Sequence, residues 1–298
     1  MEVGINVLML GARGCGKSTL LASMYYGLKE INSDQLKLRI EDTVDSAEML
    51  TRKERLLNVF ARRNGNYWTE PSHTGTKGEF KLVIDATLCK HLTFKLNMIE
   101  VPGSEFKESI SETTIKTIAQ TQVFIIAIDT PWLMEKGRQG IRHNDVQIIS
   151  ELLITIFSES DKNEDKLLLF VPMKCEKYYN SGQISRVNNR IKEVYAELIE
   201  HLTQFEYTTI YITPALTLGN LEFDQFVADE KGNEYAQYRY TGEENYAPRY
   251  TEQPLIYIMD YLLISLNRNQ EIKKPSWWNK IGNAFIATAK SISRTYFN

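Results

Sequence analysis

Residues 11–18 read Gly-Ala-Arg-Gly-Cys-Gly-Lys-Ser, and this stretch decides the fold. It fits the pattern GxxxxGK[ST] at every fixed position. Glycines let the backbone curl so that successive N–H groups point inward and meet phosphate oxygens. In this pattern Lys17 reaches the β- and γ-phosphates of a nucleotide, and the Ser18 hydroxyl is placed to bind Mg²⁺. The residues predicted to contact the phosphates are Gly11, Ala12, Arg13, Gly14, Cys15, Gly16, Lys17, Ser18 and Thr19.

The segments on either side of this stretch suit a phosphate-binding loop. Residues 3–10 form a short apolar run that ends in glycine, which is typical of a buried parallel strand. Residues 17–31 carry apolar side chains at helical spacing, so a helix is predicted to follow at once. The N-terminal end of that helix carries partial positive charge and adds to the attraction for an anion.

The rest of the chain alternates strand and helix patterns. Two nearly all-apolar runs predict central parallel strands at residues 123–129 and 167–171, and the last central strand is predicted at residues 208–212. Helices are predicted at residues 143–157, 184–204 and 252–267. Residues 36–40 predict a short strand, and residues 80–88 and 91–100 predict an antiparallel pair, because their connection is too short for a crossover helix. This order predicts an α/β fold with one doubly wound, mostly parallel sheet that contains one antiparallel strand, layered between helices.

One domain is predicted over residues 1–268, with insertions near residues 42–65 and 219–250. The first insertion reads as a helix, and the second contains a hairpin pattern. A separate segment is predicted over residues 269–298. Within it, residues 275–298 carry tryptophans and other apolar side chains near one helical face, together with three cations and no acidic residue. Such a segment is expected to lie on an anionic membrane surface, to enter a partner's groove or to fold back on its own domain.

The composition argues against several classes of protein. A hydrophobic fraction of 43% and a charged fraction of 24% are ordinary for a soluble globular chain. The net charge of −3 provides no basic field, so direct contact with nucleic acid is not expected. Three widely spaced cysteines do not suggest a disulfide framework. The first residues lack a basic signal-peptide region, and no apolar stretch approaches the ~20 residues of a membrane helix. A cytoplasmic location is therefore expected, with peripheral membrane contact through the C-terminal segment as an option.

Beyond the phosphate loop, the sequence resembles the P-loop GTPases of the translation-factor and Ras-like class. That family carries a DxxG turn, whose aspartate holds Mg²⁺ through water and whose glycine N–H meets the γ-phosphate. Residues 98–103 read MIEVPG at the corresponding place, with Glu100 for the aspartate and Gly103 for the glycine. The resemblance implies that Glu100 helps to hold Mg²⁺ and that Gly103 contacts the nucleotide. The alternative is an ordinary Pro-Gly turn at the end of a strand.

The family selects guanine through an [NT]KxD motif, whose aspartate accepts hydrogen bonds from N1–H and N2–H₂ of the base. Residues 172–176 read PMKCE, so Lys174 and Glu176 match in type and spacing while Met173 replaces the asparagine or threonine. The resemblance implies a guanine preference, because adenine presents an acceptor at N1. Ala215, in the TPA sequence after the last central strand, is implied to donate its N–H to the guanine O6. A solvated charged loop is the alternative for residues 172–176.

Residues near the γ-phosphate depart from the family pattern. The threonine that binds Mg²⁺ in the triphosphate state is assigned to Thr74, with Thr76 as the alternate. Ser104 stands where small GTPases have the glutamine that orients the attacking water, and Glu105 follows it. Arg13 either reaches the γ-phosphate or points to solvent. These departures imply slow hydrolysis, assisted by a partner or by self-association. The candidate catalytic residues are Lys17, Ser104, Glu105 and Arg13.

Taken over residues 3–267, the sequence resembles the bacterial double-GTPase-like branch of this class, most of all in the strings VPMKCEKYY and TPALTLG. Members of that branch are associated with prokaryotic conflict or defence operons. The resemblance implies a guanine-nucleotide-binding switch with GTP or GDP and Mg²⁺ as its cofactors. Two alternatives remain open at this point: a scaffold that holds GTP without useful turnover, and a P-loop kinase or ATPase.

Overall fold

The computed structural model describes residues 2–28, 36–40, 66–69, 80–88, 92–101, 112–159, 165–242 and 246–268. The predicted helix near residues 42–65 and the C-terminal segment 269–298 lie outside the described residues. The same holds for five residues assigned to the nucleotide site: Thr74, Thr76, Gly103, Ser104 and Glu105.

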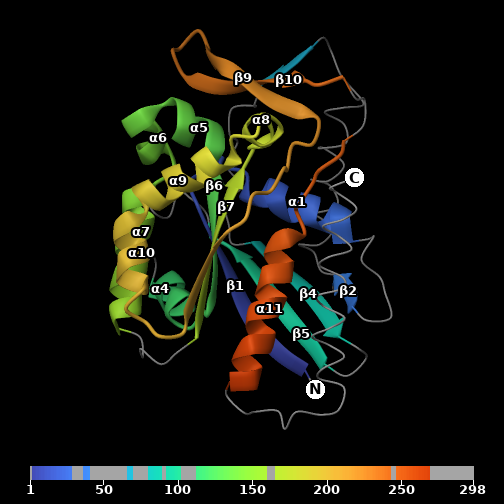
Figure 1. Cartoon of the computed structure of the whole chain (residues 1–298), viewed down its shortest axis with the longest axis vertical. Helices are drawn as coiled ribbons and strands as arrows, with labels where there is room; N and C mark the ends of the chain where they lie inside the picture. Colours follow the sequence, from blue (N-terminus) through green and yellow to red (C-terminus); the bar gives the residue numbers. More distant parts are fainter. Residues whose placement is uncertain are drawn as a thin grey trace.

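The centre of the molecule is a seven-stranded sheet with the order β2-β4-β5-β1-β6-β7-β8 (Figure 1). Its strands are β1 (Glu2–Leu10), β2 (Leu36–Ile40), β4 (Phe80–Leu88), β5 (Leu92–Glu100), β6 (Val123–Asp129), β7 (Lys166–Met173) and β8 (Thr208–Ile212). Strand β4 pairs antiparallel with both of its neighbours, and every other neighbouring pair is parallel. The predicted mostly parallel sheet with one antiparallel strand is therefore confirmed.

Helices cover both faces of this sheet (Figure 1). The first face carries α1 (Lys17–Leu28) and α11 (Gln253–Arg268). The second face carries α4 (Glu112–Ala119), α7 (Val146–Glu159), α9 (Ile184–Val194) and α10 (Ala196–Leu202). Three short helices lie in the connections after β6 and β7. They are α5 (Thr130–Glu135) and α6 (Gly137–His143) after β6, and α8 (Glu176–Asn180) after β7. The single helix predicted over residues 184–204 is instead divided at Tyr195, whose buried ring packs against Phe170 with centroids 4.8 Å apart.

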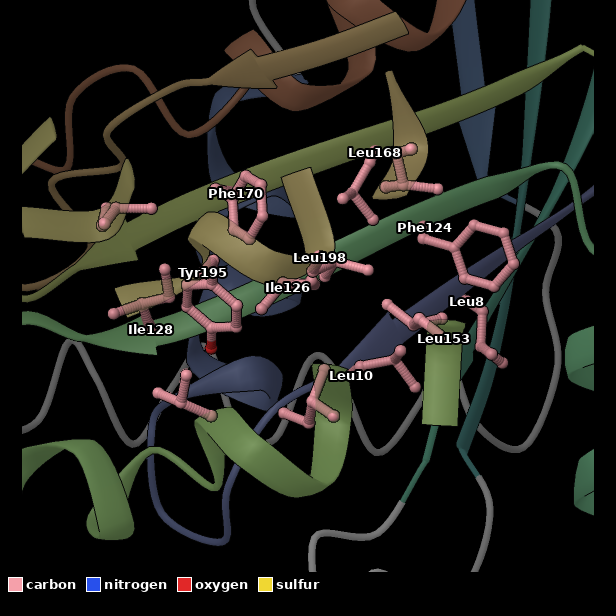
Figure 2. Packing of buried hydrophobic residues seen from close by; sticks show 14 of the residues in the cluster. Leu8, Leu10, Phe124, Ile126, Ile128, Leu153, Leu168, Phe170, Tyr195 and Leu198 are labelled. Atoms are coloured by element: carbon pink, nitrogen blue, oxygen red, sulfur yellow. The ribbon is translucent and has the colours of Figure 1, made fainter. Parts of the chain in front are cut away.

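Both faces of the central strands are buried, which explains why these strands read as continuous apolar runs. All seven residues of β6 and all eight of β7 are buried. Alternate residues of a strand point to opposite faces. Figure 2 shows the second face, where Phe124, Ile126 and Ile128 of β6 pack beneath Leu153 of α7 and Leu198 of α10. This close packing fixes the carboxyl ends of β1, β6 and β7, where the loops of the candidate site begin.

A second sheet, here called the accessory sheet, lies beside α5 and α8 at the top of Figure 1. Its strands are β3 (Tyr67–Thr69), β9 (Leu221–Ala228) and β10 (Glu234–Tyr240), in the antiparallel order β3-β10-β9. The predicted hairpin supplies β9 and β10. Strand β3 was not among the predicted strands, because three residues with no apolar alternation give no strand signal. Its pairing with β10 places Trp68 against Tyr238, with ring centroids 5.6 Å apart.

No helix in the described part of the chain combines the length and the apolar character that crossing a membrane requires.

Candidate functional site

The loop between β1 and α1 has a backbone that requires glycine. Gly11, Gly14 and Gly16 have φ values of +148°, +81° and +108°, a region that other residues rarely adopt. A Cβ atom on Gly11 would lie 2.7 Å from the carbonyl oxygen of Ala127 and 2.9 Å from Sγ of Cys15. The loop is therefore pressed against the end of β6, and the glycines of the GxxxxGK[ST] pattern are needed for its shape.

The ammonium of Lys17 is held inside this loop. Its Nζ donates hydrogen bonds to the carbonyl oxygens of Gly11, at 2.8 Å, and Ala12, at 3.2 Å, and the residue is only 4% exposed. An ammonium has three N–H donors, so these two bonds leave a third that can meet a phosphate oxygen. Arg13, in the same loop, is exposed. The structure thus holds the lysine charge inside the glycine-rich loop between β1 and α1.

Ser18 and Glu100 meet at the start of α1. The Ser18 hydroxyl donates a hydrogen bond of 2.8 Å to Oε2 of Glu100. The register of the sheet explains the contact, because Met9 pairs with Glu100 in the parallel β1–β5 ladder, close to the beginning of the loop. A hydroxyl and a carboxylate are the oxygen ligands that Mg²⁺ prefers. The two oxygen ligands, from Ser18 and Glu100, therefore fit a magnesium ion. Gly103, which the sequence analysis assigned to the γ-phosphate, lies outside the described residues.

Lys174 reaches the same loop from the end of β7. Its Nζ donates to the carbonyl oxygen of Gly14 at 3.1 Å and lies 2.7 Å from Oδ2 of Asp129. The preceding residue, Met173, is fully buried, and its Cε lies 3.2 Å from where a Cβ on Gly16 would be. The methionine therefore packs against the phosphate loop at the position where the resembled family has a hydrogen-bonding side chain.

Asp129 is a buried site residue that the sequence reasoning did not identify. Its side chain caps α5 by accepting a hydrogen bond from the N–H of Trp132 at 3.4 Å. Burial alone would raise the pKa of Asp129, but the charge of Lys174, with a smaller contribution from His143, outweighs it and lowers the pKa below its ordinary value. Asp129 is therefore ionised at neutral pH. The Asp-Thr-Pro sequence at residues 129–131 was an available signal, because it is typical of a helix start.

Glu176 lies at the first position of α8 and is completely buried. Its Oε1 accepts a hydrogen bond of 2.6 Å from the N–H of Leu218, while Oε2 has no hydrogen-bond partner within the described residues. Burial raises the pKa of Glu176 to about 8, although backbone hydrogen bonds and Arg249 act in the opposite direction. The side chain is mostly protonated at neutral pH. Contact with guanine N1–H and N2–H₂ thus requires Glu176 to lose this proton and to turn an oxygen toward the base.

The loop at residues 213–219 is also held by bonds within the protein. The N–H of Ala215 donates to the carbonyl oxygen of Pro172 at 3.0 Å, and Ala215 is fully buried. Leu216 exchanges two backbone hydrogen bonds with Arg249, of 2.9 and 3.1 Å. The predicted donation from Ala215 to a guanine O6 would therefore require the bond to Pro172 to break.

Comparison with known proteins finds distant solved structures. No protein-family model matches the chain, and no curated protein matches its sequence. The GTPase-like domain of S. cerevisiae Ski7, bound to GDP and inorganic phosphate, shares 18% identity over 91% of this chain and 52% of that one, with a TM-score of 0.42. The same domain bound to GTP gives 15% identity, the same coverage and a TM-score of 0.41. Sup35 complexed with GDP gives 11% identity over 72% and 38% of the two chains, with a TM-score of 0.33. The chain spans about half the length of the Ski7 structures.

Proposed function

We propose that this chain is a Mg²⁺-dependent guanine-nucleotide-binding switch that hydrolyses GTP slowly. The observation that carries the proposal is the 2.8 Å hydrogen bond from the Ser18 hydroxyl to Glu100, beside a phosphate loop that already holds Lys17 in place. These groups bring a cation and two oxygen ligands for a metal ion together beside the glycine-rich loop after β1. Such a combination suits the triphosphate of a nucleotide.

Ser18 and Glu100 are the described residues that would hold the metal ion, and Thr74 or Thr76 is proposed to join them in the triphosphate state. Bound Mg²⁺ would offset the negative charge of the β- and γ-phosphates. Lys17 supplies a fixed positive charge to the same phosphates. The loop therefore binds and orients the triphosphate with donors that need little rearrangement.

The choice of guanine is the part of the proposal that rests on Lys174, Glu176 and Ala215. Lys174 supports it, because the side chain runs along the phosphate loop to Gly14, where its stem can border a bound nucleoside. Glu176 supports it through its unpartnered Oε2, which is an acceptor for base N–H groups once ionised. Two rival functions share the phosphate loop. A kinase or ATPase would prefer adenine to guanine, and a non-hydrolysing scaffold would bind GTP without turning it over.

Hydrolysis is proposed to involve Lys17 with Ser104 or Glu105 near the attacking water, and Gly103 at the γ-phosphate. Because neither Ser104 nor Glu105 is a glutamine, a partner or a second copy of the chain is proposed to assist. The nucleotide-binding domain is proposed to span residues 1–268, with residues 269–298 as a peripheral segment that contacts a membrane surface or a partner. A cytoplasmic role in a prokaryotic conflict or defence system rests on the resemblance alone.

The deciding experiment is a titration of the purified full chain with GTP, GDP and ATP, each with and without Mg²⁺. Glu176→Ala is measured alongside, and Glu151→Ala, on the exposed side of α7, serves as the matched control. Strong preference for GTP and GDP over ATP, lost in Glu176→Ala but kept in Glu151→Ala, is the expected result. Equal or tighter binding of ATP would favour the kinase or ATPase, and binding of GTP without phosphate release would favour the scaffold.

A further inference from the structure

Lys174 combines two structural features that each cost free energy. Its side chain is 4% exposed, and the side chain of its partner Asp129 is 1% exposed, so two charges have been removed from water. Its backbone has φ +55°, the left-handed region that non-glycine residues rarely occupy. A left-handed residue of this kind costs about 1–3 kcal/mol, and a buried ion pair seldom stabilises a fold more than apolar side chains of similar size would. Costs of this kind concentrate at functional sites.

The Lys174 ammonium connects Asp129 to the backbone of Gly14. The Lys174 ammonium lies 2.7 Å from Asp129 on one side and 3.1 Å from the Gly14 carbonyl oxygen on the other. In a planar trans peptide the C=O and the following N–H point in opposite directions. Holding the Gly14 carbonyl on Lys174 therefore directs the N–H of Cys15 into the loop, where it donates to the Ala12 carbonyl oxygen over a long 3.3 Å. A phosphate oxygen can replace that weak bond without moving the peptide.

Asp129 is itself fixed from several directions. Its backbone N–H donates to Oδ1 of Asn144 at 2.7 Å, and its carbonyl oxygen accepts from Nδ2 of the same residue at 3.2 Å. One side-chain oxygen, Oδ1, caps α5 at Trp132, while Oδ2 faces Lys174 and lies 3.8 Å from Nε2 of His143. A carboxylate fixed in this way sets where the lysine ammonium can stay, because the flexible lysine aligns to the rigid acid.

We propose that Asp129 is a positioning residue of the nucleotide site, which acts through Lys174 to hold the Gly14 peptide and thereby the phosphate loop in its binding shape. The inference rests on the proposed function only in requiring a phosphate-bearing nucleotide, and it holds for guanine and adenine alike. Without the carboxylate, the buried ammonium of Lys174 loses the charge that compensates it, so it leaves its place or gives up its proton. Either change releases Gly14.

The test compares the affinity of the full chain for Mg-GTP and Mg-ATP in four proteins: wild type, Asp129→Asn, Lys174→Met and the double variant. Asparagine keeps an oxygen for the helix cap at Trp132, so this substitution isolates the charge. Asp129→Asn is expected to weaken the binding of whichever nucleotide the wild type binds by about ten- to a hundredfold, the usual range for residues that orient a ligand-contacting group. In the Lys174→Met background the same substitution is expected to change nothing further, because the residue it acts through is gone.

Asp165→Asn is the matched control. Asp165 is a buried carboxylate just before β7, where it accepts a hydrogen bond from Ser265 of α11, at the opposite end of the strand from Lys174. This control is expected to lower the melting temperature and leave both nucleotide affinities unchanged. If it weakens binding as much as Asp129→Asn does, the effect is general destabilisation and the inference is wrong.

Three further outcomes separate the hypotheses. Unchanged affinity in Asp129→Asn, or an equal loss from this substitution in the presence and absence of Lys174, would overturn the positioning role while leaving the proposed function intact. A wild type that binds neither nucleotide would overturn the proposed function itself. If Asp129→Asn alone does not fold, the comparison of Lys174→Met with the double variant, which buries no unpaired charge, decides the question: a further loss of affinity contradicts the role.

Discussion

The Ser18 hydroxyl donates to Glu100 Oε2 across 2.8 Å, which joins the first turn of α1 to the end of β5. Substituting Glu100→Gln removes the negative charge while keeping the size of the side chain. Mg²⁺ binds carboxylates more tightly than amides, so the Mg²⁺ concentration needed for half-maximal GTP binding is expected to rise by about ten- to a hundredfold. Titration of Mg²⁺ at fixed nucleotide checks this. An unchanged Mg²⁺ requirement would place the metal ion elsewhere.

The buried Glu176 carboxyl makes stability depend on pH. Its pKa of about 8 in the folded chain lies above the ordinary 4.5, so the folded state holds the proton that the unfolded state has released. The contribution of protonated Glu176 to the free energy of unfolding is fully present below about pH 4.5 and is lost as pH rises toward 8. Relative to Glu176→Gln, which stays neutral, the wild type is expected to lose about 1.4 kcal/mol of unfolding free energy per pH unit across this window. Urea denaturation of both proteins at pH 5, 6.5 and 8 measures the difference, and parallel curves would contradict it.

The conformation of Gly11 predicts a large effect from a small substitution. A Cβ at this position meets the Ala127 carbonyl oxygen at 2.7 Å, which is backbone and cannot turn aside. Gly11→Ala is therefore expected to lower the melting temperature and to abolish nucleotide binding. Gly232→Ala, in the hairpin turn of the accessory sheet, also replaces a glycine of positive φ (+80°) but has open space around it. This control should cost only about 1 kcal/mol and leave binding intact. Similar melting temperatures for the two variants would contradict the prediction.

Trp132 of α5 packs against both α6 and strand β9 of the accessory sheet. Its ring stacks on His143 with centroids 4.0 Å apart and contacts Phe226 of β9 at 4.6 Å. Because the side chain is buried, Trp132→Ala is expected to cost about 3–5 kcal/mol of unfolding free energy. The neighbouring ion pair of Lys136 and Glu234 is partly exposed, so Lys136→Ala is expected to cost less than about 1 kcal/mol. Denaturant unfolding of the two variants measures both losses of unfolding free energy. A larger loss in Lys136→Ala than in Trp132→Ala would show that the ion pair, and not the tryptophan, is the main contact with the accessory sheet.

Local patterns were sufficient to predict most of the main sheet and the glycine-rich turn that joins β1 to α1. An apolar strand, a glycine-rich turn and an amphipathic helix are all encoded within the first 31 residues, and the runs at β6 and β7 are apolar because both of their faces are covered. Ser18 was assigned to Mg²⁺ from the glycine-rich pattern and Glu100 from the family resemblance, and the structure brings the two side chains into hydrogen-bond contact. The strands and helices were predictable because each depends on neighbours in sequence, whereas this contact depends on the register of β1 and β5.

The features that were not predicted depend on contacts between distant segments. Nothing near Asp129 indicates that Lys174, 45 residues later, would compensate its charge. Nothing near Glu176, which was assigned to the base with a solvated charged loop as the alternative, indicates that its carboxyl is buried against Leu218 of a different loop. The break at Tyr195 interrupts a sequence whose apolar spacing is continuous. In each case a contact with a residue far away in the sequence decides the conformation, and the local pattern does not.

The β3–β10 pairing has a consequence for how the chain is made. Thr69 faces Gln237 in this ladder, a separation of 168 residues. At the usual synthesis rate of about 5–20 residues per second, β3 leaves the ribosome roughly 10–30 s before the strand it pairs with. Strands β4 to β8 are all translated in that interval, after β1 and β2, so the main sheet can begin to assemble first. A product that stops before residue 234 contains every strand of the main sheet but lacks β10, the partner with which residues 67–69 pair.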